Sequence, residues 1–243
     1  MGRCRVAFSV ALAVVATATA ASGAEPRAVI ELFTSQGCSS CPPADKLAGE
    51  LSSDPSLVVM SLAIDYWDYL GWKDTLALPG HATRQRAYAA VRGDREVYTP
   101  QVVVNGVVHV VGNDKAALEA AIAQPHSPEM LSVPVKLSVT GGQLTVSISA
   151  AGKPVAAEVW LCPTTRSVPV MITRGENHGH TITYTNVVRR WMRLGEWNGA
   201  AHTFTVPKSD FVTDAIDDVA VLVQAGDAKH PGAMLGAATL ALR

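Results

Sequence analysis

Apolar positions in the first half of the chain form either short continuous runs or runs with helical spacing. Ala28–Phe33 and Leu57–Ile64 are short apolar runs typical of buried strands. Pro42–Leu51 opens with proline and places its apolar side chains on one helical face. His81–Val91 and Asp114–Ala123 have helical patterns as well. The pattern therefore predicts alternating strands and helices in this part of the chain.

The clearest hairpin signal follows the second predicted helix. Two β-branched runs, Gln101–Val104 and Val107–Val111, flank the dipeptide Asn105-Gly106. This dipeptide is strongly preferred in two-residue hairpin turns, because both of its residues tolerate a positive φ. The predicted element order over residues 28–124 is therefore β-α-β-α-β-β-α.

From Leu131 onward the apolar pattern changes to period two. Val133, Val135 and Leu137 alternate with polar residues before the turn at Gly141-Gly142. Several short alternating strands separated by turn residues predict an all-β sandwich. The further strand-like runs are Val155–Leu161, Val168–Thr173, Thr181–Thr185, His202–Val206 and Val219–Gln224. We expect an α/β domain over residues 25–126 and a β-sandwich domain over residues 127–243.

Residues 1–24 have the pattern of a secretory signal peptide. Arg3 and Arg5 precede the apolar run Val6–Ala18, and Ser22-Gly23-Ala24 forms a small-x-small cleavage site. The run is shorter than the roughly 20 residues that span a bilayer, which favours a cleaved peptide over a membrane anchor. We therefore expect a periplasmic or secreted protein that is not anchored in the membrane after cleavage.

The composition excludes several classes of protein. Hydrophobic residues make up 48% and charged residues 17% of the 243 positions, which excludes a polar disordered chain. The formal net charge is −1, whereas a general nucleic-acid binder needs a clustered excess of Lys and Arg. We expect no nucleic-acid partner, and the sequence carries no indication of the oligomeric state.

The candidate chemistry lies in Cys38-Ser39-Ser40-Cys41, between a predicted strand and a predicted helix. This spacing allows a small-ring disulfide, and a helix N-terminus favours thiolate. In such settings the pKa of a thiol falls from about 8.5 to roughly 3.5–7.5. Cys38 is predicted to be the attacking thiolate and Cys41 the resolving thiol. Cys162 lies in an apolar stretch and is predicted to be a small buried hydrophobe.

Residues 28–124 resemble the thioredoxin fold in the position of the cysteine pair, in the order of elements and in Tyr98-Thr99-Pro100-Gln101 at the start of the hairpin strand. The resemblance implies a cis peptide bond between Thr99 and Pro100, facing the cysteines. It also implies a buried acid that accepts the proton of the resolving thiol, and this role falls on Glu31. The expected fold class is thus an α/β thioredoxin-like domain followed by an all-β sandwich domain.

Most of the chain after residue 24 is also similar to an exported bacterial family known only as a domain of unknown function with a thioredoxin-like N-terminal domain. The similarity lies in Glu31–Asp45, Asp65–Trp72 and Arg174–Asn177. The aromatic segment Asp65–Trp72 belongs to an insert that thioredoxin lacks. It is expected either to pack on the second domain or to form a wall beside the cysteines, and the two are compatible. Arg174 and Glu176 are expected to form an ion pair.

These observations lead to two hypotheses about function. The first is a thiol–disulfide oxidoreductase that needs no cofactor and acts on protein or small-molecule thiols and disulfides through Cys38 and Cys41. The alternative is a non-catalytic exported binding protein, either a copper carrier or a peptide-binding module, whose disulfide is structural. Copper would require a histidine beside the two thiolates. His178 and His180 have a chelating spacing, but their Gly/Asn-rich surroundings favour a solvated loop.

Overall fold

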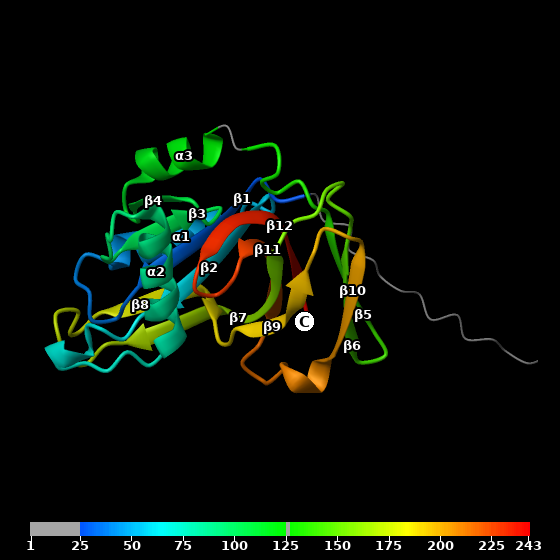
Figure 1. Cartoon of the computed structure of the whole chain (residues 1–243). Coiled ribbons are helices and arrows are strands. Elements are labelled where there is room, and N and C mark those ends of the chain that lie inside the picture. The colour runs from blue at the N-terminus through cyan, green and yellow to red at the C-terminus, as the bar shows by residue number, and fades with distance from the viewer. Residues whose placement is uncertain (1–24, 125–126) are drawn as a thin grey trace, which may run out of the picture.

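A computed structural model describes residues 25–124 and 127–243, and this part of the chain is mostly β (Figure 1). Strands make up 41% and helices 18% of the structure. The signal peptide predicted for residues 1–24 lies outside the described residues. Within the described part, no helix is long and apolar enough to cross a membrane.

Nine strands form one mixed sheet in the order β12-β11-β7-β8-β2-β1-β3-β4, with β9 paired to β7 off this path. At its centre β1 pairs in parallel with β2 and antiparallel with β3. The strands are β1 (Ala28–Thr34), β2 (Leu57–Ala63), β3 (Gln101–Val104), β4 (Val108–Val111), β7 (Ala157–Met171), β8 (Thr181–Val188), β9 (Met192–Trp197), β11 (Asp218–Gly226) and β12 (Pro231–Ala241).

The fold class predicted from the sequence is wrong. Strands β1–β4, which were expected to belong to a thioredoxin-like α/β domain, instead continue into the same sheet as the strands of the expected sandwich. The join lies between β2 and β8, where Ser61 stands opposite Val187. The Ser61 hydroxyl donates to the carbonyl of Thr185 at 2.7 Å, and the Asn186 amide donates to the carbonyl of Val59 at 3.1 Å.

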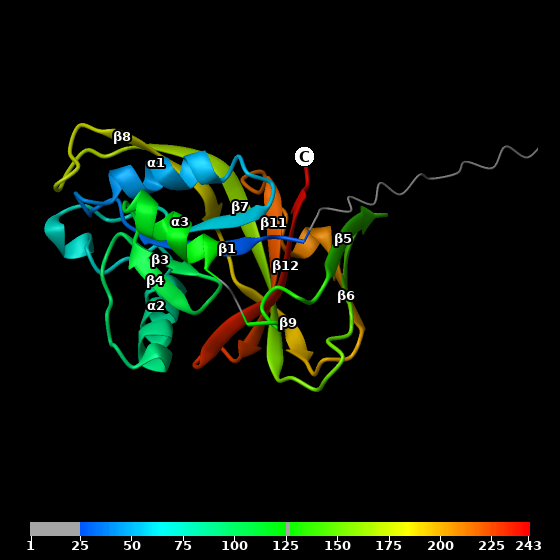
Figure 2. The ribbon, with the colours of Figure 1, turned by 90° about the horizontal axis from the view of Figure 1, so that it is seen from above.

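A three-stranded sheet forms a second layer. It consists of β5 (Val135–Thr140), β6 (Gln143–Ile148) and β10 (His202–Pro207), in the order β10-β6-β5. Its apolar side chains, such as Leu144 and Val146, pack against β7 and β11 of the large sheet. These three strands lie at one side of the molecule and the helices at the other (Figure 1, Figure 2).

The three α-helices of the described chain cover the end of the large sheet that contains β1. They are α1 (Pro42–Leu51), α2 (Pro79–Arg92) and α3 (Lys115–Ala123), and α1 has the predicted bounds. Helices α1 and α3 pack on the face of β1 that carries Ile30 and Leu32. Helix α2 packs on the opposite face, which carries Val29 and Phe33. Adjacent residues of β1 therefore point toward different helices.

The predicted hairpin at Asn105-Gly106 is confirmed. Strands β3 and β4 pair antiparallel across it, and Asn105 and Gly106 both have positive φ, as a type I′ turn requires. The turn also contacts the C-terminal hairpin, because the backbone N–H of Met234 donates to the carbonyl of Asn105 at 2.9 Å. A residue with a Cβ at position 106 would meet the carbonyl oxygen of Gly232 at 2.4 Å, so the close approach requires glycine.

Candidate functional site

Cys38 and Cys41 form a disulfide in the turn between β1 and α1, with their Cα atoms 5.4 Å apart. Cys41 is the N-cap of α1, and its carbonyl accepts the backbone N–H groups of Ala44 and Asp45. Cys41 is fully buried. Cys38 precedes the exposed residues Ser39 and Ser40 and has 4% of its surface exposed. Of the two cysteines, Cys38 is therefore the slightly more exposed.

The structure brings Thr99 and Pro100 to the cysteine pair. The predicted cis peptide bond between Thr99 and Pro100 is confirmed. The Ser40 hydroxyl lies 3.4 Å from the Sγ atom of Cys38 and 3.4 Å from the carbonyl oxygen of Thr99. Ser40 thus connects the two segments that the sequence predicted to face each other.

Glu31 lies apart from the cysteines in a buried ion pair. Its Oε1 atom accepts from the Arg84 guanidinium at 2.6 Å, and its Oε2 atom accepts from the Tyr88 hydroxyl at 2.5 Å. Arg84 also donates to the Gln224 side chain of β11 at 2.8 Å. Arg84 and Tyr88 belong to α2, so Glu31 points to the face of β1 opposite α1. No described contact joins Glu31 to Cys38 or Cys41.

Asp45 is the buried acid on the same helix face as Cys41. The two residues are four positions apart in helical backbone, and side chains at that spacing are neighbours that lean toward the helix N-terminus. Asp45 is 2% exposed, and neither of its carboxyl oxygens has a hydrogen-bond partner among the described residues. This role was not predicted from the sequence, although Asp45 is a charged residue at an otherwise apolar position of the helix.

Other polar groups surround Asp45 in the same buried region. Burial raises the pKa of Asp45 well above its ordinary value, the Thr34 hydroxyl opposes this rise, and the nearby Asp74 carboxylate adds to it. The hydroxyls of Thr34 and of Tyr184 in β8 are buried and, within the part of the chain that the structure describes, have no hydrogen-bond partner. Burial also raises the pKa of Asp74, whose carboxylate accepts the backbone N–H of Gln36 at 2.7 Å. A buried carboxyl group with a raised pKa therefore lies one helical turn from the resolving cysteine.

The aromatic insert lies against the cysteine turn. The indole N–H of Trp67 donates to the Thr99 hydroxyl at 2.8 Å, and that of Trp72 donates to the Gln36 side chain at 2.8 Å. A Cβ on Gly37 would lie 3.1 Å from the Cβ of Trp67. Tyr69, which is 75% exposed, has its ring 6.1 Å from that of Trp67. The insert thus lies beside the cysteine turn, and its Trp72 also packs against Ile172 and Ile182 of the C-terminal half, in line with both compatible expectations.

Asn177, from the loop between β7 and β8, also reaches the cysteine turn. Its side-chain amide donates to the carbonyls of Gln36 and Cys38, both at 2.9 Å. The hairpin of β7 and β8 extends to the N-terminal end of α1 (Figure 2). The expected ion pair between Arg174 and Glu176 is not present among the described residues. The 139-residue separation of Asn177 from Cys38 left no local signal in the sequence.

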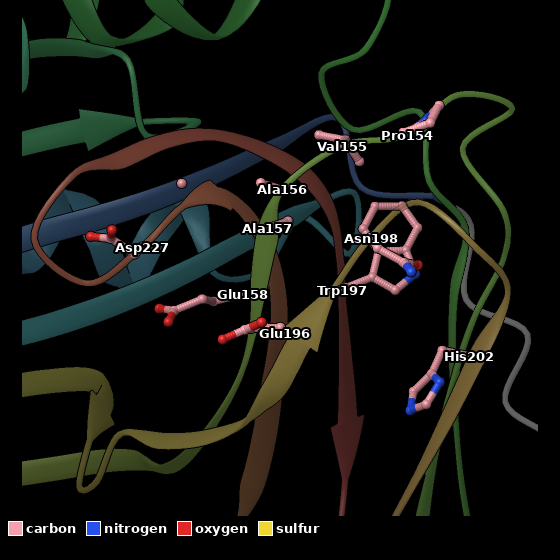
Figure 3. Close-up of a pocket in the computed structure, with 11 residues that line it drawn as sticks. Pro154, Val155, Ala156, Ala157, Glu158, Glu196, Trp197, Asn198, His202 and Asp227 are labelled. Atoms are coloured by element: carbon pink, nitrogen blue, oxygen red, sulfur yellow. The ribbon is translucent and has the colours of Figure 1, made fainter.

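A cavity of about 740 Å³ lies in the C-terminal half (Figure 3). Its lining includes Glu158, Glu196 and Trp197 but neither cysteine. Arg193 bonds to Glu158 at 2.6 Å and to Glu196 at 3.0 Å, so both carboxylates already have a cation. Cys38 and Cys41 therefore lie outside this cavity.

Two further predictions concern Cys162 and the pair His178 and His180. Cys162 is free and fully buried, and burial raises the pKa of its thiol, in agreement with the predicted small buried hydrophobe. His178 and His180 flank Gly179, and both are exposed. Among the described residues, no group of three or more His, Cys, Asp or Glu side chains is arranged to hold a metal ion.

The chain is similar to one protein family and to two solved structures. The model of a family described as "protein of unknown function (DUF1223)" matches residues 29–224. The crystal structure of protein AGR_C_4864 from Agrobacterium tumefaciens has a TM-score of 0.79 and 33% identity, covering 89% of this chain and 95% of that one. HBP35 of Porphyromonas gingivalis has a TM-score of 0.59 and 15% identity, covering 90% and 76%, which shows likeness of fold alone. No curated protein matches the chain.

Proposed function

The chain belongs to the DUF1223 family of proteins of unknown function, and from the geometry of its cysteine turn we propose that it is an exported thiol–disulfide oxidoreductase. The observation that carries this proposal is the Cys38–Cys41 disulfide at the N-terminus of α1, where Cys38 adjoins the exposed Ser39 and Ser40 and the fully buried Cys41 lies one helical turn from the buried Asp45 carboxyl group. The site, as distinct from the fold class, is similar to that of the thioredoxin-like superfamily, because Thr99 and Pro100 lie beside the cysteine pair.

The proposed reaction is a pair of thiol–disulfide exchanges. In the reduced protein, the Cys38 thiolate attacks one sulfur of a substrate disulfide, forms a mixed disulfide and releases the first substrate thiolate. The Cys41 thiolate then attacks the Cys38 sulfur, closes the Cys38–Cys41 bond and releases the second substrate thiolate. The substrate gains the two electrons that the cysteine pair loses. The reverse sequence oxidises a dithiol, and protein or small-molecule thiols and disulfides are the proposed partners.

Asp45, rather than Glu31, is suited to accept the proton that Cys41 must lose. Both oxygens of Glu31 are bound to α2 on the far face of β1, whereas the oxygens of Asp45 are unpartnered on the Cys41 side of α1. Burial raises the pKa of Asp45 toward that of a thiol, which reduces the free-energy difference of proton transfer between the two groups. Thr34 and Tyr184 supply hydroxyls beside this carboxyl group.

Substitution of single cysteines tests the proposed roles. We expect Cys41→Ser to accumulate a stable mixed disulfide at Cys38 with a protein or glutathione disulfide, because nothing remains to resolve it. We expect Cys38→Ser to form none, because the remaining thiol at Cys41 is fully buried. Intact mass measured after alkylation detects the adduct. Equal adduct formation by the two variants would contradict the assignment of Cys38 as the attacking sulfur.

The second candidate function is a binding protein with a structural disulfide, and the near-complete burial of both sulfurs favours it. The two candidates differ in how the disulfide responds to glutathione. A structural bridge has a potential below about −300 mV and resists the glutathione pool, whereas an exchanging pair equilibrates with it. Incubation of the wild-type protein across a range of glutathione ratios, followed by alkylation, separates the two. Persistence of the bridge at every ratio would exclude the oxidoreductase.

A further inference from the structure

The turn that carries Cys38 is held by groups from two distant parts of the chain. On one side, Asp74 of the aromatic insert accepts the N–H of Gln36 at 2.7 Å, and Trp72 donates to the Gln36 side chain. On the other side, the Asn177 amide donates to the carbonyls of both Gln36 and Cys38. Asn177 is 4% exposed, so no water competes freely for these carbonyls. The backbone from Gln36 to Cys38 is therefore held from both sides.

Asn177 contributes most of the hydrogen bonding to these two carbonyls. Among the described residues, no other group donates to the carbonyl of Gln36, and only the backbone N–H of Cys41, at 3.2 Å, also donates to that of Cys38. A single planar amide with two N–H groups fits two neighbouring carbonyls of one turn. A buried carbonyl that loses its donor carries the free-energy cost of an unmet hydrogen bond, which favours rearrangement of the turn.

The position of Asn177 is itself determined by packing against the insert. Gly175, two residues earlier, has a positive φ, and a Cβ there would lie 3.3 Å from the Cβ of Trp72. The backbone N–H of Gly179 donates to the carbonyl of Ile172 at 2.8 Å and closes the loop. The loop between β7 and β8 is thus placed against the cysteine turn independently of the disulfide.

We propose that Asn177 is a positioning residue of the redox site, supplied by the C-terminal half of the chain, which holds Cys38 within bonding reach of Cys41. This inference rests on the proposed oxidoreductase function. In the reduced protein, the two amide hydrogen bonds restrict the turn to conformations in which the two sulfurs are near each other. The effective concentration of one thiol toward the other is then high, which favours the disulfide and speeds resolution of a mixed disulfide.

The test compares Asn177→Asp with Asn186→Asp in the full chain. Asn186 provides a matched control, because its amide also donates to a backbone carbonyl, that of Val59, in the contact between β2 and β8. We expect Asn177→Asp to lower the equilibrium constant for Cys38–Cys41 disulfide formation against glutathione about tenfold, a shift of about 30 mV. We expect Asn186→Asp to change only the thermal unfolding midpoint. Asn177→Ala, which introduces no charge, is measured in parallel and should shift the equilibrium in the same direction.

The outcomes separate positioning from simple stabilisation. If Asn177→Ala lowers the equilibrium constant for disulfide formation while Asn186→Asp does not, the proposal holds. A shift confined to Asn177→Asp reflects the added charge and overturns it. If the Asn177 variants that fold have a lower thermal unfolding midpoint but an unchanged glutathione equilibrium, Asn177 has only a structural role and the proposal is overturned. The readout concerns the protein's own disulfide, so it stays interpretable if the protein proves inactive on substrate disulfides. That result would contradict the proposed function and leave the role of Asn177 to be decided by the equilibrium.

Discussion

Replacing Arg84 by methionine is expected to lower the free energy of unfolding by about 3–5 kcal/mol, because it leaves the Glu31 carboxylate buried without its cation. The Glu31 side chain is fully buried and that of Arg84 is 9% exposed. The Arg84 guanidinium also donates to Tyr88 and Gln224, so one substitution removes hydrogen bonds that link β1, α2 and β11. Chemical denaturation followed by tryptophan fluorescence measures the loss.

A surface ion pair supplies the control for this prediction. Arg27 bonds to Asp54 at 3.0 Å, but the two side chains are 56% and 40% exposed. Exposed pairs contribute about 0–1 kcal/mol, so Arg27→Met should change stability little. The double variant with Glu31→Gln and Arg84→Met should recover part of the loss, because it removes the uncompensated charge. Equal losses for the two single Arg variants would contradict the interpretation of the Glu31–Arg84 pair as a buried ion pair.

Replacing Asp45 by asparagine is expected to slow the resolution of a mixed disulfide at Cys38 about 100-fold at pH values above the raised pKa of Asp45, since only the ionised carboxylate accepts a proton and a positioned general base contributes at least about this factor. The variant keeps the shape of the side chain and removes its capacity to accept a proton. The measurement follows glutathione release from the Cys38 mixed disulfide, after reduced protein is mixed with excess oxidised glutathione. Glu50→Gln, on the exposed side of the same helix, is the control and should leave the rate unchanged.

Asp45→Asn is also expected to change how the stability of the protein depends on pH. The folded protein keeps Asp45 protonated at pH values where the unfolded chain, with its ordinary carboxyl pKa, has released the proton. Between these two pKa values the folded state binds more protons, so the stability of wild-type protein falls as pH rises, by at most about 1.4 kcal/mol per pH unit. Asp45→Asn removes this contribution. The stability of the variant relative to wild type should therefore increase with pH through that window, and a parallel pH dependence of the two proteins would contradict the assigned environment of Asp45.

Local elements of the fold were predictable because each depends on residues close together in the chain. The helical spacing of apolar residues and the initial proline predicted α1 at Pro42–Leu51, and the dipeptide Asn105-Gly106 predicted the β3–β4 turn. Both elements depend on local backbone preference. Pairing between distant strands was not predictable. Strand β7 is one long strand, where the pattern of residues 155–173 indicated two, because its middle section is half exposed and pairs with β8. Strands β9 and β12 carried too little alternation to be recognised.

For the candidate site, the sequence by itself identified Cys38, Cys41, Thr99 and Pro100, because a Cys-x-x-Cys pair before a helix and a proline at the start of a strand are recognisable from short spacings. Only the tertiary structure placed Glu31 with Arg84 on one face of β1 and buried the Asp45 carboxyl group one helical turn from Cys41. Which helix covers each face of a sheet decides the surroundings of a side chain on that face. The contact of Asn177 with the cysteine turn depends on the pairing of β2 with β8, which lie more than 100 residues apart in the chain. Such long-range contacts leave no period or spacing in the sequence, and for that reason the contact of Asn177 with the cysteine turn became visible only in the folded protein.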